Sequence, residues 1–161
     1  MADDEEIRVN PFVPIAPATE KRHHLSTEEY LKRNSEAICN ETLNKRNFES
    51  ASLDLLAPNV IAMHETYAVC EGRDALIENL KQTLQAIPNY HADILNTTVV
   101  VDERKGCATV YLHLFLNGMP DGIRRESVNV LSWERNDSQW LLTRHAGMRG
   151  PPADIAPFGG L

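Results

Sequence analysis

The alternation of apolar and polar positions is clearest in the segment 125–133, RESVNVLSW, which it predicts to be a β-strand. Val128 and Val130 fall on one face of this strand, and Ser127 and Asn129 fall on the other, because side chains alternate between the two faces of a sheet. Short polar side chains interleaved with apolar ones indicate a sheet face that partly lines a cavity. We therefore expect a functional site on this strand.

A second strand, 140–147, follows the polar turn ERNDS and is predicted to pair with the first. Regular alternation places Trp140 and Leu142 on one face of this strand and Thr143 and His145 on the other. One sheet face is then expected to gather the polar side chains of both strands, which are Arg125, Ser127, Asn129, Thr143 and His145.

The remaining elements are predicted from helical periodicity, strand alternation and turn residues. A capping box, STEE, opens a helix over residues 26–46, and leucines at helical spacing in 76–87 predict a long helix that Pro88 stops. The other predicted elements are a short helix at 49–56 and strands at 60–64, 67–70, 90–101 and 107–116.

This order of elements predicts an α+β domain over residues 26–147: a curved antiparallel sheet wrapped around a long helix and two N-terminal helices. Residues 1–25 contain three prolines, which favour extended backbone, and are expected to form a flexible arm outside the domain. That arm is either a disordered leader or a strap whose apolar side chains dock on the domain or a partner subunit. The Pro- and Gly-rich segment 148–161 is expected to be an irregular tail.

Charge and composition narrow the classes of partner. The formal net charge of −7 argues against a protein that binds nucleic-acid phosphates, and no apolar run approaches the length of a membrane-spanning helix. The acidic start, MADDEE, does not resemble a secretory signal. Three scattered cysteines without a CxxC pair predict neither a disulfide framework nor a zinc site. We expect a cytoplasmic protein with a small-molecule ligand, no metal and no cofactor.

Two segments, EGRDALIENLKQTL and SVNVLSWERNDSQWLLTRHAG, together with the element order, resemble the SnoaL-like branch of the nuclear transport factor two-like superfamily over residues 26–147. The resemblance implies a cone-shaped α+β barrel whose mouth admits a hydrophobic small molecule, and a homodimer formed through the outer sheet face. Members include polyketide cyclases, ketosteroid isomerases, scytalone dehydratases and non-catalytic binding modules. The implied function is an isomerase, cyclase or dehydratase of secondary metabolism, with a non-catalytic ligand-binding or dimerisation module as the alternative.

Comparison with scytalone dehydratases assigns roles to individual residues. Their active-site serine and asparagine, two apart on a strand, match Ser127 and Asn129, and their pocket histidine after the long helix matches His91. An active-site tyrosine falls on His64, and an acidic residue falls near Asn44, which cannot act as a carboxylate. The resemblance therefore implies a relative with a re-worked site.

Histidines are the main candidates for proton transfer, because imidazole titrates near neutral pH and needs no cofactor. The predicted catalytic residues are His91, His64, His145, Ser127 and Asn129. The predicted substrate-binding residues are Tyr67, Arg125, His113, Tyr111 and Thr143. The register of the strand 107–116 stays open, because a slip of one residue exchanges Tyr111 and His113 with Val110 and Leu112 on the cavity face.

Overall fold

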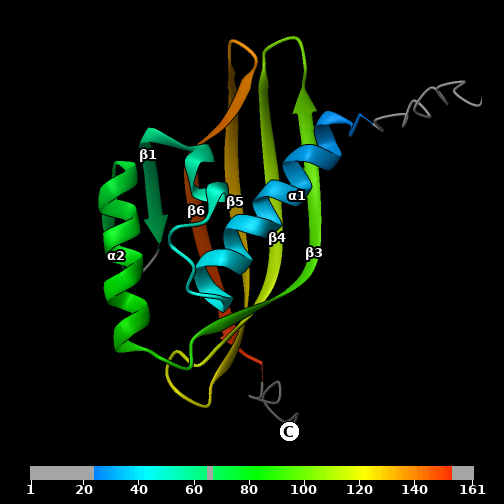
Figure 1. Ribbon diagram of the computed structural model, residues 1–161. Helices are drawn as coiled ribbons and strands as arrows, with labels where there is room; N and C mark the ends of the chain where they lie inside the picture. The colour runs from blue at the N-terminus through cyan, green and yellow to red at the C-terminus, as the bar shows by residue number, and fades with distance from the viewer. Residues whose placement is uncertain (1–23, 65–66, 154–161) are drawn as a thin grey trace, which may run out of the picture.

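The computed structural model describes residues 24–64 and 67–153 (Figure 1). The predicted order of helices and strands is confirmed, with some boundaries shifted by a few residues. The elements are α1 (Thr27–Cys39), the π-helical turn η1 (Asn40–Asn44), the 3₁₀ turn η2 (Ala51–Leu55), β1 (Leu56–His64), β2 (Tyr67–Glu71), α2 (Arg73–Ala86), β3 (His91–Asp102), β4 (Cys107–Asn117), β5 (Arg124–Asn136) and β6 (Gln139–Pro152).

The six strands form one curved sheet in the order β2-β1-β6-β5-β4-β3, and α1 and α2 lie on the same side of it (Figure 1). The α+β prediction is confirmed. The curved sheet stays open, with β2 and β3 at its opposite edges. One detail of the prediction is wrong: β1 pairs with β6 in parallel, whereas an antiparallel sheet was expected. None of the helices in the described part of the chain has the length and apolar composition needed to span a lipid bilayer.

The core lies between α1 and the inner face of the sheet. Alternation in β4 buries Val110, Leu112 and Leu114, which settles the register that the sequence left open. On α1, Ser35 is fully buried, and its hydroxyl oxygen accepts a hydrogen bond from the indole N–H of Trp133 at 3.1 Å. This bond satisfies both polar groups in the core, where an unpaired donor would be costly.

The start and end of α1 are fixed by side chains that bind backbone groups. Ser26 Oγ accepts from the Glu29 N–H at 3.1 Å, as the capping box predicts. At the other end, η1 brings Asn44 against β3, where its amide donates to Ala92 O and accepts from Ala92 N–H, both at 2.8 Å. Asn44, which replaces a carboxylate in the family comparison, therefore ties the helix to the sheet.

Strand β6 contains a β-bulge that controls which side chains face inward. Ser132 pairs with Arg144 while the next residue, Trp133, pairs with Leu142, so Thr143 is the extra residue. A one-residue bulge reverses the alternation beyond it. As a result Leu142 and His145 both face the interior, although they are three residues apart.

Strand β6 also continues beyond its predicted end at Gly147. Arg149 pairs with Ser127, and Pro152 pairs with Arg125. The prediction that the irregular tail begins at residue 148 is therefore wrong, because residues 148–152 belong to the sheet. The predicted N-terminal arm, apart from its last two residues, and the segment 154–161 lie outside the described residues.

Candidate active site

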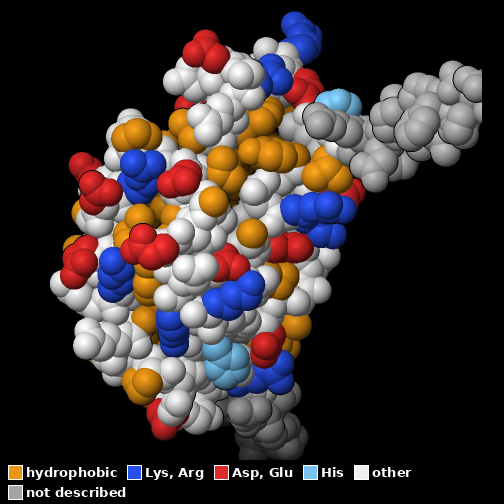
Figure 2. Space-filling model, viewed as in Figure 1, with side chains coloured by type: hydrophobic (Ala, Val, Ile, Leu, Met, Phe, Trp, Pro, Cys, Tyr) orange, Lys and Arg blue, Asp and Glu red, His pale blue; other side chains and the backbone are white. Residues whose placement is uncertain are grey.

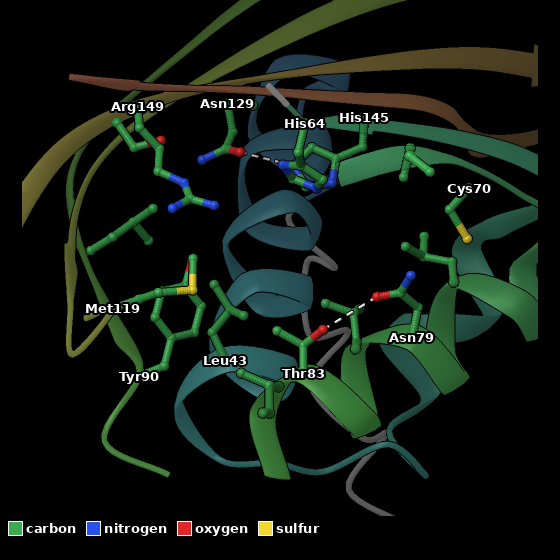
Figure 3. Close-up of a pocket in the computed structure, with 18 residues that line it drawn as sticks. Leu43, His64, Cys70, Asn79, Thr83, Tyr90, Met119, Asn129, His145 and Arg149 are labelled. Atoms are coloured by element: carbon green, nitrogen blue, oxygen red, sulfur yellow. Dashed lines mark hydrogen bonds between the residues drawn. The ribbon is translucent and has the colours of Figure 1, made fainter. Parts of the chain in front are cut away.

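A cavity of about 100 Å³ lies between the sheet and α2 (Figure 3). Leu76, Leu80 and Leu84 of α2 supply much of its apolar wall. Five polar side chains face it from the sheet: His64 from β1, Ser127 and Asn129 from β5, and His145 and Arg149 from β6. Four of the predicted catalytic residues are therefore gathered at one cavity, and they come from three adjacent strands.

Asn129 and His145 form the fixed part of this polar wall. Asn129 pairs with Gly147 across β5 and β6, two residues beyond His145, and His145 Nε2–H donates to Asn129 Oδ1 at 2.9 Å. An amide oxygen can only accept, so this bond places the proton of a neutral His145 on Nε2. Figure 3 shows the amide nitrogen of Asn129 on the other side of the carbonyl, toward Arg149.

Gly147 makes room for this arrangement. It lies between Asn129 and His64, and a Cβ atom at this position would be 2.7 Å from both Asn129 Oδ1 and His64 Nδ1. Any side chain larger than hydrogen would therefore push these two groups apart. Gly147 acts as a spacer that lets an asparagine and a histidine from non-neighbouring strands converge.

His64 and His145 form a contact pair, with ring centroids 4.8 Å apart and ring planes perpendicular. Burial, and then the neighbouring His64, lower the pKa of His145 to about 3. Burial, and then the positive charge of Arg149, lower the pKa of His64. Both imidazoles are therefore neutral at neutral pH, the form in which histidine can accept a proton.

Ser127 and Arg149, which pair near the start of β5 and the end of β6, complete the polar wall. Ser127 is buried, and its hydroxyl donates to Met148 O at 2.8 Å, so its oxygen remains to accept a bond from a ligand. Arg149 was missed by the sequence analysis, which placed it in the tail. The signal was present: His145, Gly147 and Arg149 alternate on one face once the strand is extended two residues beyond Gly147.

The other predicted site residues lie elsewhere. His91 is exposed, with Nδ1 2.9 Å from Asn89 O, because Ala92 takes the inward position at the start of β3. Tyr111 and His113 face away from the cavity on the outer side of β4, where His113 Nε2 is 2.9 Å from Glu126 Oε1. The predictions that these three residues serve the cavity are wrong.

Two further predictions fail for reasons of strand geometry. Thr143 is the extra residue of the bulge, and its hydroxyl donates to Ser132 O at 3.2 Å instead of lining the cavity. Arg125 lies where β5 passes beyond the cavity and is not among the lining residues. The backbone of Tyr67 begins β2, but its side chain lies outside what the structure describes.

Comparison with solved structures agrees with this architecture. A protein of unknown function from Pseudomonas putida, described as nuclear transport factor two-like, superposes with a TM-score of 0.65 at 13% identity, over 77% of this chain and 88% of its own. The chain has the nuclear transport factor two-like fold. No protein-family model and no curated protein sequence matches it.

Two other proteins with this fold are described by an activity. A proposed ketosteroid isomerase from Parabacteroides distasonis has a TM-score of 0.60 at 20% identity, over 83% of this chain and 96% of its own. A proposed dehydratase from Streptomyces avermitilis has a TM-score of 0.60 at 14% identity, over 75% of this chain and 94% of its own. At these identities the likeness concerns the fold, so the chemistry must be argued from the cavity.

Two further observations concern the charge of the surface and the capacity to bind a metal ion. Figure 2 shows the face that carries both helices, where basic and acidic side chains are interspersed, so the described part of this face has no single large basic patch. Within residues 24–64 and 67–153 no group of three or more His, Cys, Asp or Glu side chains is placed to hold a metal ion.

Proposed function

We propose that this chain is a cofactor-independent enzyme of secondary metabolism that moves a proton on a hydrophobic small molecule, as an isomerase, cyclase or dehydratase. The observation that carries the proposal is the pair of neutral imidazoles, His64 and His145, beside amide and guanidinium donors on one cavity wall. A base and a set of donors on the same wall are what enolisation of a carbonyl compound requires.

In this proposal each side chain has a distinct task. His64 takes a proton from the carbon next to a carbonyl group, and the electron pair of the broken C–H bond moves onto the carbonyl oxygen. Asn129 Nδ2 and the Arg149 guanidinium stabilise the negative oxygen, while His145 holds the Asn129 carbonyl. The His64 imidazolium then returns its proton to another carbon, or to a leaving hydroxide in a dehydration.

The experiment is deuterium exchange into a panel of enolisable cyclic and aryl ketones in D₂O, followed by proton NMR. Exchange reports proton abstraction without knowledge of the natural product. We expect the wild-type protein to exchange at least one ketone, and His64→Gln to lower its rate about 10²–10⁴-fold. His91→Gln and His113→Gln are matched controls, because both histidines lie outside the cavity. Exchange that survives unchanged in His64→Gln contradicts the assigned role.

A non-catalytic ligand-binding module is the second candidate. It is favoured by the lack of any Asp or Glu among the described residues that line the cavity, since a carboxylate is a common general base. In this case ketones that bind to the wild-type protein show no exchange above that of the buffer.

We also propose that two copies associate through the outer sheet face. Both helices lie on the opposite side of the sheet, and the outer face exposes Tyr111, Val128 and Met148 on three adjacent strands. Apolar side chains gathered on an uncovered sheet face are typical of a protein interface.

A further inference from the structure

A second cavity of about 80 Å³, bordered by α1, adjoins the first, so that the two form neighbouring lobes. The two lobes share six lining residues, which are Leu43, His64, Leu76, Leu80, Asn129 and His145. His64, His145 and Asn129 therefore stand at the junction between the lobes, within reach of a ligand that occupies both.

The second lobe is apolar. Its walls are mostly leucine side chains, including Leu112, Leu131 and Leu142 of the sheet. The hydroxyls of Ser35 and Thr42 also border it, but Ser35 accepts from Trp133 and Thr42 donates to Ile38 O at 2.7 Å. The lobe offers a ligand hydrocarbon contacts and little hydrogen bonding, so it fits an apolar group.

The first lobe adds a charged side chain to a wall that is otherwise largely apolar. Arg149 is the one cationic side chain among the described residues that line either lobe, and none of those residues is acidic. Figure 3 shows Arg149 and Asn129 reaching into the cavity side by side, with Tyr90 and Met119 facing Arg149 from the opposite wall. The charge of Arg149 reaches the junction, since it contributes to the lowered pKa of His64.

We propose that the substrate is an amphipathic organic acid, whose carboxylate binds the Arg149 guanidinium in the first lobe while Asn129 Nδ2 stays available to the reacting carbonyl, and whose apolar group passes the histidines into the second lobe. A carboxylate matches the planar donor pair of one guanidinium. A phosphate, with about two charges, calls for more donors than one arginine and one amide. This inference names the substrate class of the site proposed above and so rests on that function, but binding alone tests it.

The probes are 4-phenylbutanoate, its primary amide 4-phenylbutanamide, and propanoate, titrated by calorimetry at pH 7.5 into the full-length protein. We expect the acid to bind at least about 10-fold more tightly than the amide, because a charge-assisted bond to arginine is lost in the amide. Propanoate, which lacks the apolar group, should also bind at least about 10-fold more weakly than 4-phenylbutanoate.

Arg149→Gln should remove the preference for the acid and leave the affinity for the amide within about 2-fold of wild type. Arg125→Gln is the matched control, because Arg125 lies on the neighbouring strand outside both lobes and should keep the preference. Circular dichroism checks that each variant is folded. Backbone amide shifts at Gly147 on adding the acid should locate it at the junction.

The inference is overturned if the amide binds as tightly as the acid, if Arg149→Gln retains the preference, or if 4-phenylbutanoate does not bind at millimolar concentration. Tight, Arg149-dependent binding of the acid without any ketone exchange supports this ligand class and counts against catalysis. Exchange of neutral ketones without a preference for acids supports the enzyme and overturns the ligand class.

Discussion

Gly147→Ala tests whether the convergence of Asn129 and His64 depends on the missing side chain. The added Cβ would lie 2.7 Å from Asn129 Oδ1 and 2.7 Å from His64 Nδ1, where ordinary contact begins at 3.4 Å, an overlap of about 0.7 Å at each. Backbone strain plays no part, because Gly147 does not have a positive φ. The two polar groups must therefore shift toward the cavity.

Shifting Asn129 lengthens its hydrogen bond with His145, which has a net worth of about 1 kcal/mol, and overpacking of this kind costs about 1–3 kcal/mol. Alanine recovers less than about 1 kcal/mol by restricting the unfolded chain. We expect a net loss of about 1–3 kcal/mol in the free energy of unfolding.

Urea titration with tryptophan fluorescence measures this loss, because Trp133 and Trp140 are buried. Gly150→Ala, on the same strand, is the control: its Cβ would meet one backbone oxygen of Glu126 at 3.2 Å, so a smaller effect is expected. If the free energy of unfolding of Gly147→Ala lies within about 0.5 kcal/mol of the wild-type value and ketone exchange persists, Gly147 is not a required spacer.

Two further predictions concern titration and assembly. Folding lowers the pKa of His145 from 6.5 to about 3, so the unfolded chain binds the extra proton and stability falls as the pH drops from 6.5 toward 3. Between pH 6.5 and 5, the free energy of unfolding of wild type, measured by urea titration, should fall by up to about 2 kcal/mol more than that of His145→Gln. If the two proteins lose stability equally over this pH range, the assigned pKa shift is contradicted. For assembly, light scattering should give a dimer for wild type and a monomer for Val128→Glu, while Leu25→Glu, an exposed position just before α1, stays dimeric. A monomeric wild type at micromolar concentration counts against the outer-face dimer.

The fold was predictable because its strongest signals are local. Alternation in β5 placed Ser127 and Asn129 together on the cavity face, and helical spacing located α2. Sheet closure and strand direction depend instead on contacts between distant segments. The parallel pairing of β1 with β6 has no local signature, so the sequence suggested an antiparallel sheet.

The site was predictable only in part, because single-residue shifts in register decide which side chains face inward. His145 was placed on the correct face, but regular alternation also put Thr143 there, and the bulge removes it. His91 missed the cavity by one position, because Ala92 faces inward. Arg149 was hidden by the following Gly-Pro-Pro, which resembles an irregular tail although the strand continues through it.

The parallel pairing of β1 with β6 also bears on how the protein folds. His64 lies on the first strand and His145 on the last strand of the sheet in chain order, and their contact requires these two strands to become neighbours. Pairings between segments so distant in sequence carry a large loop-closure entropy and form slowly. The histidine pair is therefore expected to assemble late in folding, after the β3–β4–β5 hairpins. A partly folded chain would hold most of the hydrophobic core without a working site.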